Sequence, residues 1–153
     1  MRATDILKQD HRMAEQLMTQ LQEADGQSTG ASYRPIFEKL QAALDMHMQA
    51  EEKIFYPAAG KFEELKDLVV ESYDEHALVK SQLAQMNELE PNTPEFQEVL
   101  TQMMAGIEHH VSEEEGEMFE KIEAAMGEEH LQAIGSQIEQ LRNDATSSRT
   151  ARM

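Results

Sequence analysis

The chain of 153 residues is long enough for one ordinary domain with its own hydrophobic core. It holds 30 acidic and 13 basic residues, and its formal net charge of −17 disfavours binding to nucleic acid or anionic membranes. The lack of cysteine excludes disulfides, thiolate catalysis and zinc–thiolate sites. The sequence also shows no signal-peptide pattern and no apolar run of roughly 18 residues, so we expect a cytoplasmic protein.

Helix is predicted along nearly the whole chain, because glycine and proline are few and gather at breaks between periodic segments. The breaks lie at 25–32, 56–61, 89–94 and Gly127. At the third break, Thr93 is expected to cap a helix that has Pro94 in its first turn. These breaks define four long segments and a fifth that starts near Glu128.

Each long segment carries a stripe of residues at steps of three and four, which is typical of a helix with one face in a core. The stripes are Leu7, His11, Ala14, Met18, Leu21; Phe37, Leu40, Leu44, His47, Glu51, Ile54; Val69, Ser72, His76, Val79, Leu83, Met86; and Phe96, Leu100, Met103, Ile107, His110, Glu114. Short connections imply antiparallel neighbours. The fold predicted is all-α, an up-down-up-down antiparallel four-helix bundle with an additional C-terminal helix. We expect the domain to cover residues 1–145 and the polar tail 146–153 to be disordered.

Six polar side chains interrupt the apolar stripes. They are His11, His47, Glu51, His76, His110 and Glu114. The second and fourth segments each carry His-x-x-x-Glu, a spacing that puts both side chains on one helix face. The first and third segments each add one histidine, and an acidic residue precedes each of these. The chain therefore repeats a hairpin motif, which predicts a site with approximate twofold symmetry.

Neighbouring polar residues are expected to leave this face. His109 and Glu113 lie about 100° round the helix from the stripe, so they should sit at its rim. Glu115 and Glu117 fall toward the polar side, and His130 is expected on the surface.

Six converging polar residues need a common partner, because a buried carboxylate without one costs several kcal/mol. A network of imidazolium and carboxylate groups is one alternative. A metal site explains the pattern better, since imidazoles and carboxylates suit iron, manganese or zinc. The six side chains are too many for one tetrahedral zinc ion, but they fit two octahedral ions with bridging glutamates. The Glu-x-x-His pattern of ferritin-like proteins is absent from the sequence.

At these residues the sequence resembles the hemerythrin-like family, also called the HHE cation-binding domain. The likeness covers about Thr4 to Met126. It rests on "DH" at 10–11, "HMQAEEKIFYP" at 47–57, "DEH" at 74–76 and "HVSEEEGEMF" at 110–119. The resemblance implies a non-haem di-iron centre, with manganese or zinc as substitutes. It also implies that His11 and His47 hold one iron and His76 and His110 the other. Glu51 and Glu114 would bridge the two irons together with an oxo, hydroxo or water ligand.

The sequence departs from the family's oxygen carriers, which have two histidines spaced by four on the third helix. Here Ser72 and Lys80 stand four residues before and after His76, and the second bridging residue is Glu114 where the carriers have aspartate. The vacant position would be filled by solvent, by a small ligand, or by His109 or Glu113.

The resemblance implies a protein that binds or reacts with a small ligand such as O2, NO or H2O2, in sensing or stress response. The alternatives are a di-iron enzyme that detoxifies peroxide or NO or repairs iron–sulfur clusters, a reversible oxygen carrier, and a metal-free interaction bundle. A sensor would need a separate redox or signalling protein as partner. The oligomeric state stays open.

Overall fold

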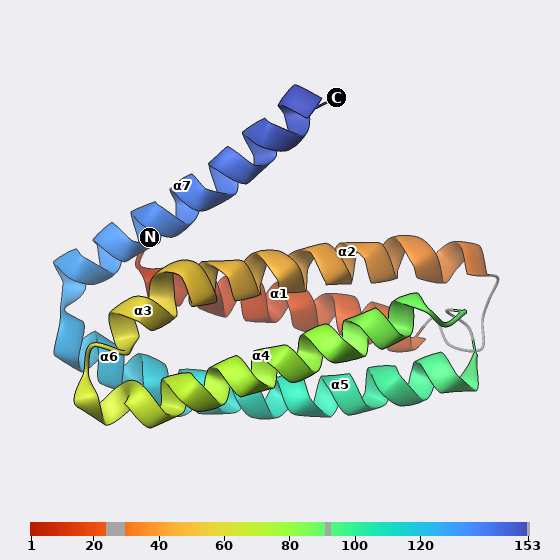
Figure 1. Ribbon diagram of the computed structural model, residues 1–153, viewed down its shortest axis with the longest axis horizontal. Coiled ribbons are helices and arrows are strands. Elements are labelled where there is room, and N and C mark those ends of the chain that lie inside the picture. The colour runs from red at the N-terminus through yellow and green to blue at the C-terminus, as the bar shows by residue number, and fades with distance from the viewer. Residues whose placement is uncertain (24–29, 91–92, 153) are drawn as a thin grey trace.

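The computed structural model describes residues 1–23, 30–90 and 93–152, and the side chains in these ranges except those of 30–32 and 147–152. Its α-helices are α1 (Ala3–Glu23), α2 (Gly30–Ala50), α3 (Tyr56–Ala59), α4 (Lys66–Asn87), α5 (Pro94–Glu113), α6 (Phe119–Met126) and α7 (Glu128–Arg152). Helices α1, α2, α4 and α5 lie side by side along the long axis, and α7 leaves one end of the bundle at a slant (Figure 1). The predicted all-α bundle with an extra C-terminal helix is confirmed.

Three shorter helical pieces join these helices. Two are single π-helical turns, η1 (Glu51–Phe55) between α2 and α3 and η3 (Glu114–Met118) between α5 and α6. The third is a short 3₁₀ turn, η2 (Glu63–Leu65), which leads into α4. Both π turns begin at one of the two stripe glutamates, so the helix geometry changes at the predicted site.

The predicted breaks are confirmed in part. Thr93 caps α5, because its Oγ1 accepts a hydrogen bond from the Phe96 N–H at 3.3 Å, and Gly127 ends α6 at a φ of 85°. The break expected at 56–61 is wrong in its first half, since helix continues to Ala59. Pro57 is tolerated there because the preceding π turn already interrupts the regular hydrogen bonding. Most of the first break, residues 24–29, lies outside the described residues.

The core consists of two hydrophobic clusters separated by a polar layer. One cluster includes Ala14, Leu44, Val79 and Ile107, and the other includes Leu7, Ala50, Val69 and Met118. Along each long helix the stripe histidine falls between these two sets. The polar residues therefore share one level of the bundle and are closed in by apolar side chains above and below.

Helix α7 packs on the outside of the bundle through Leu131, Ile134 and Ile138, which are buried. The amino terminus lies beside it (Figure 1), and a Cβ added at Gly135 would stand only 2.0 Å from the Met1 carbonyl oxygen. The domain boundary expected at residue 145 falls within α7, and a disordered tail beyond it stays a prediction. In the described ranges, every helix is too short or too polar to cross a bilayer.

Candidate metal centre

The structure brings the six polar stripe residues together in the layer between the two apolar clusters. They come from α1 (His11), α2 (His47), η1 (Glu51), α4 (His76), α5 (His110) and η3 (Glu114). All six are buried, and the side chains of Glu51 and Glu114 are 0% and 1% exposed. Their donor atoms form two groups that share Glu51, each with all members within 4.8 Å of one another. We call His11 with His47 half-site A, and His76 with His110 half-site B.

The two glutamates link the half-sites. Glu51 Oε1 lies 2.9 Å from His47 Nε2 and 3.1 Å from His76 Nε2. Glu114 lies 3.1 Å from His11 Nε2 through Oε1 and 3.2 Å from His110 Nε2 through Oε2. Each carboxylate therefore reaches one histidine of each half-site, as the repeated hairpin predicts.

A second carboxylate stands behind each imidazole. The pairs are His11 Nδ1 with Glu115 at 2.7 Å, His47 Nδ1 with Asp10 at 2.8 Å, His76 Nδ1 with Glu52 at 2.7 Å and His110 Nδ1 with Glu75 at 2.6 Å. An ionised carboxylate can only accept, so Nδ1–H donates and Nε2 is the nitrogen that faces the centre, where it carries the lone pair once the imidazole is neutral. The prediction that Glu115 falls toward the polar side is wrong.

The π turns change which residues further along the chain face the centre. In a regular helix the fifth residue after Glu51 lies about 140° round the axis, at 100° per residue. A π turn has hydrogen bonds from residue i to residue i+5 and rotates less per residue, so Tyr56 comes closer to the side of Glu51, and Phe119 likewise to the side of Glu114. The residue after each glutamate also turns toward a histidine across the bundle. The repeated "EE" followed by an aromatic five residues after the first glutamate is the sequence signal for both turns.

Electrostatics couple the histidines to the glutamates. Burial lowers the pKa of His47, but the charge of Glu51 and the hydrogen bond to Asp10 outweigh it and raise the pKa to about 10. Burial likewise lowers the pKa of His110, while Glu114 and Glu51 raise it to about 12. Burial raises the pKa of Glu51, but His47 in particular holds it well below its usual range. Without metal, these residues form the imidazolium–carboxylate network that the sequence left as an alternative.

The donor set fits metal ions. Three buried side-chain atoms have no hydrogen-bond partner in the described part of the chain, and two of them, His47 Nε2 and Glu51 Oε2, belong to the centre. An unsatisfied buried imidazole nitrogen beside an unsatisfied carboxylate oxygen is the arrangement that a cation would complete. Imidazole and carboxylate donors in two groups suit two ions of the iron, manganese or zinc kind.

The half-sites differ in one aromatic residue. The Tyr56 hydroxyl donates to Glu114 Oε2 at 2.5 Å and lies 3.2 Å from His76 Nε2 and 3.3 Å from His110 Nε2. The equivalent Phe119 stacks on His11 with ring centroids 5.9 Å apart. Burial, with the charges of Glu51 and Glu114, raises the pKa of Tyr56 well above its usual range, so the phenol keeps its proton. The sequence did not place Tyr56.

Two residues considered as additional ligands lie outside the centre. His109 is exposed, and its Nε2 lies 3.2 Å from Glu113 Oε1. Both side chains belong to a separate exposed cluster instead of either half-site. His130 is exposed on α7, as predicted.

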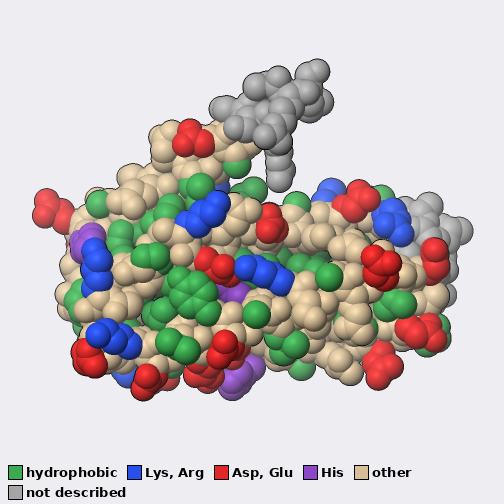
Figure 2. Space-filling model, viewed as in Figure 1, with side chains coloured by type: hydrophobic (Ala, Val, Ile, Leu, Met, Phe, Trp, Pro, Cys, Tyr) green, Lys and Arg blue, Asp and Glu red, His purple; other side chains and the backbone are tan. Residues whose placement is uncertain are grey.

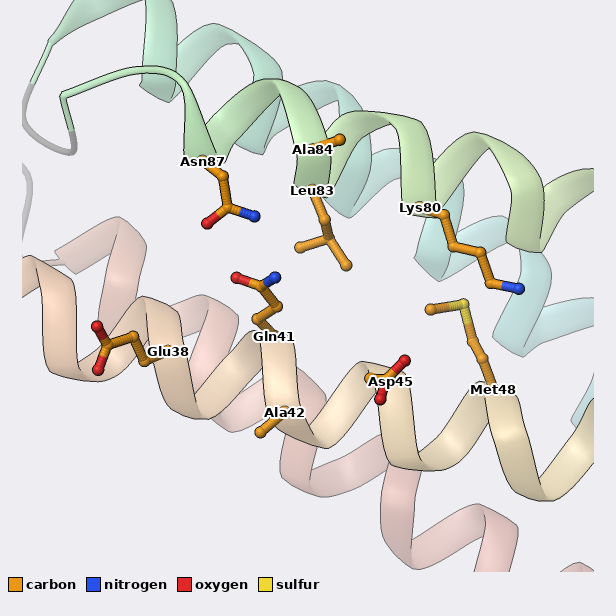
Figure 3. Close-up of a pocket in the computed structure, with 9 residues that line it drawn as sticks. All are labelled: Glu38, Gln41, Ala42, Asp45, Met48, Lys80, Leu83, Ala84 and Asn87. Atoms are coloured by element: carbon orange, nitrogen blue, oxygen red, sulfur yellow. The ribbon is translucent and has the colours of Figure 1, made fainter.

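The half-sites also differ in what covers them. Helix α7 packs against α1 and α2 on the side of half-site A, where Arg142 reaches Asp10 Oδ2 at 2.5 Å. On the side of half-site B, a cavity of about 220 Å³ between α4 and α5 is lined by His76 and His110. A groove of about 500 Å³ between α2 and α4 (Figure 3) holds none of the six residues, and Lys80 and Met48 are among its lining side chains.

The helical fold and the buried layer of histidines and glutamates place the chain among helical bundle proteins that bind metal ions. The family model for the Hemerythrin HHE cation binding domain matches residues 2–122, and the chain belongs to this family. The family was predicted from the sequence and is confirmed.

Comparison with known proteins gives three relatives. A hemerythrin HHE cation binding domain-containing protein from Mycobacterium kansasii, solved by crystallography, is 26% identical and superposes with a TM-score of 0.74 over 96% of this chain and 91% of that one. An uncharacterized hemerythrin-like protein of Schizosaccharomyces pombe is 26% identical over 92% of this chain and 69% of its own length. A protein named DNA nickase from Nostoc is 29% identical over 86% of this chain, which spans only 36% of that relative.

Proposed function

We propose that the chain holds two iron ions in the buried centre and binds or reacts there with a small diatomic or peroxide ligand, in sensing or stress response. The observation that carries this proposal is the convergence of four Nε2 atoms and two carboxylates in one buried layer, with each imidazole oriented by an outer carboxylate. Such outer partners fix the tautomer and orientation of metal-bound histidines.

The charges support two divalent ions. The centre contains six carboxylates, namely Glu51, Glu114, Asp10, Glu52, Glu75 and Glu115. Arg142 and Lys80 are basic side chains within 3.0 Å of an outer carboxylate, and each balances one negative charge. With neutral histidines, four negative charges are left, or three if the exposed Arg12, 4.0 Å from Glu115, is counted as well. Two divalent cations balance them, which removes the need for protonated imidazoles in the core.

The surroundings of half-site B favour reaction over reversible carriage of oxygen. In the family's carriers a second histidine stands on the third helix, but here the positions four residues from His76 hold Lys80 and the buried Ser72. The Tyr56 hydroxyl lies beside it, close to His76 and His110. Bound iron would supply open coordination positions and the electrons to reduce a small ligand. The Tyr56 hydroxyl holds a proton beside the histidines of half-site B, and the apolar clusters exclude water. A ligand reduced there would therefore meet a proton donor.

The nickase relative does not change this proposal. About two thirds of that protein lies outside the aligned region. The present chain has a net charge of −17, which opposes contact with a phosphate backbone. We therefore propose a small-molecule ligand, with a redox or signalling protein as partner, and no nucleic acid.

The test begins with metal-free protein loaded anaerobically with ferrous iron, whose metal content and optical spectrum are measured. We expect close to two irons per chain, and a spectrum that changes on addition of oxygen, peroxide or NO. Zinc-loaded protein, which has no redox chemistry, is the control. A firm value of one iron or none in folded protein would overturn the proposal.

The same sample separates reaction from carriage. After exposure to oxygen the protein is purged with argon, and we expect the ferrous spectrum not to return. Recovery of the ferrous spectrum over several cycles would identify an oxygen carrier instead.

A further inference from the structure

A second cluster of metal-ligating side chains lies outside the buried centre, on the surface between α4 and α5. Its members are Glu71, Glu75, His109 and Glu113. We propose that this cluster captures a divalent metal ion at the mouth of the cavity between the two helices, and that the cavity is the route of the ion to half-site B. This inference rests on the proposed metal centre and adds the way in which it is filled.

The cluster has the geometry of a metal site. Glu71 and Glu75 are four residues apart on α4, and His109 and Glu113 are four apart on α5, so each pair lies on one helix face. One donor atom from each residue lies within 4.8 Å of the others. His109 Nε2 stands 3.2 Å from Glu113 Oε1 and 3.9 Å from Glu75 Oε2. One imidazole and three carboxylates suit ferrous iron, manganese or zinc.

Glu75 joins the cluster to the buried centre. Its Oε1 accepts a hydrogen bond from His110 Nδ1 at 2.6 Å, while its Oε2 faces His109. One carboxylate therefore touches an exposed histidine on one side and a histidine of half-site B on the other.

The cavity of about 220 Å³ supplies a route independent of this contact. Glu75 and His109 of the cluster line it together with His76 and His110, so these two cluster residues and both histidines of half-site B share one cavity. Gly106 is also part of its wall, and a Cβ added there would meet no atom within 4 Å. The wall thus leaves open space where a side chain could stand. Figure 2 shows a histidine beside acidic side chains at the lower edge of the bundle.

The cluster is not a by-product of the repeated hairpin. At the positions of half-site A that correspond to Glu71, His109 and Glu113, the chain has other residues. These are Ile6, Met46 and Ala50. Only Asp10 corresponds to an acidic member of the cluster, and Arg142 covers it. The metal-ligating surface therefore belongs to half-site B alone, at the face that α7 leaves open.

Exposed donors of this kind hold an ion weakly, because water competes for it, whereas the buried donors hold it tightly once it has shed its water. Capture at the mouth raises the local concentration of the ion beside the cavity. The experiment therefore measures both a weak site and a rate of filling.

The capture site is tested with the double variant His109→Gln/Glu113→Gln, which spares Glu75 and with it the orientation of His110. Glu108→Gln, an exposed neighbour on α5, is the control for lost negative charge. Protein loaded beforehand with zinc is titrated with Mn²⁺, and free Mn²⁺ is followed by electron paramagnetic resonance. We expect one weak Mn²⁺ site in the wild type and in Glu108→Gln, and its loss in the double variant.

Filling is measured by mixing metal-free protein anaerobically with ferrous iron and trapping the free ion with a chelator at set times. We expect the double variant to fill about tenfold more slowly, in line with the loss of local cation enrichment, and still to reach the same final iron content. Gly106→Leu, which fills the cavity, should slow filling while keeping the weak Mn²⁺ site, and Ala105→Leu, on the exposed neighbour, should not slow it.

Each other outcome has a distinct meaning. An unchanged Mn²⁺ site or an unchanged filling rate in the double variant would overturn the capture role, and unchanged filling in Gly106→Leu would overturn the route. Wild-type protein that never reaches two irons would instead overturn the proposed buried centre.

Discussion

The two half-sites are built from the same repeated motif, yet they face different surroundings. Half-site A lies under α7, with Phe119 stacked on His11 and Arg142 on Asp10. Half-site B has the Tyr56 hydroxyl beside its histidines and an open cavity between α4 and α5. The duplicated histidines and glutamates thus provide equivalent donors, whereas the residues around them provide access and a proton on one side only.

The largest effect is expected from substituting Glu51, which the two half-sites share. Glu51 contacts His47 of half-site A and His76 of half-site B, so Glu51→Ala should empty both half-sites and reduce the metal content from two ions per chain to near zero. Glu51→Gln keeps the size of the side chain and should also lose metal, because the negative charge is gone. Elemental analysis of purified protein, with circular dichroism to verify folding, measures the effect.

Glu113→Ala is the matched control for this substitution, since Glu113 lies outside both half-sites. It should keep two buried ions. Equal loss of metal from Glu51→Ala and Glu113→Ala would mean that the ions are held somewhere other than in the buried layer.

The inward position of the six polar residues could be predicted from the sequence, but their surroundings could not. His110 and Glu114 sit on an apolar stripe, so a period of 3.6 residues is enough to place them inside. Tyr56 follows a π turn, where that period fails, and Glu115 contacts the centre only through a histidine of another helix, His11. The cover over half-site A depends on the direction in which α7 leaves Gly127, which local sequence does not determine. The sequence therefore predicted the symmetric part of the centre and missed the asymmetric part.

The second prediction exchanges the aromatic residues that distinguish the half-sites. Tyr56→Phe should keep two irons but slow the reduction of peroxide by about a hundredfold, the usual size of the effect of a positioned proton donor. Stopped-flow spectroscopy of iron-loaded protein measures the rate. Unchanged reduction in Tyr56→Phe would show that the phenol of half-site B plays no part.

Phe119→Tyr is the converse substitution at half-site A. A buried hydroxyl without a prepared partner should lower the free energy of unfolding by about 1–3 kcal/mol, and it should not speed the reaction. Urea unfolding of the metal-free protein measures the cost. Faster reduction in this variant would mean that ligand also reaches half-site A.

The third prediction concerns pH, to which both half-sites respond in the same direction. In the metal-free protein the pKa values of His47 and His110 are raised from 6.5 to about 10 and about 12. A histidine whose pKa is higher in the folded than in the unfolded protein stabilises the folded state. This stabilisation is complete below the pKa of the unfolded state, and it is lost as the pH rises through the pKa of the folded state. The melting temperature of metal-free protein should therefore fall from pH 6.5 toward pH 10.

Metal reverses this dependence. Binding requires neutral imidazoles, so loading near pH 7.5 should release protons, and metal affinity should rise with pH. Calorimetry in buffers of different ionisation enthalpy measures the release. A melting temperature that is constant from pH 6.5 to 10 without metal, or loading without proton release, would contradict the imidazolium network.

The smallest expected effect compares the two basic residues that neutralise outer carboxylates. Arg142 and Asp10 are 22% and 18% exposed, while Lys80 is 51% exposed beside Glu52. Removing the largely buried ion pair by Arg142→Ala should lower the free energy of unfolding by about 1 kcal/mol. Lys80→Ala should lower it by less than about 0.5 kcal/mol, because water screens an exposed pair. Arg142→Ala should also release metal to a chelator faster than the wild type. Loss of an outer carboxylate would raise the release rate roughly tenfold. The effect of Arg142→Ala should be smaller, because Asp10 still accepts a hydrogen bond from His47. Urea unfolding and the rate of metal release measure both variants. Equal costs, or faster release from Lys80→Ala, would show that α7 does not shield half-site A and that the two sides of the centre differ only in Tyr56 and Phe119.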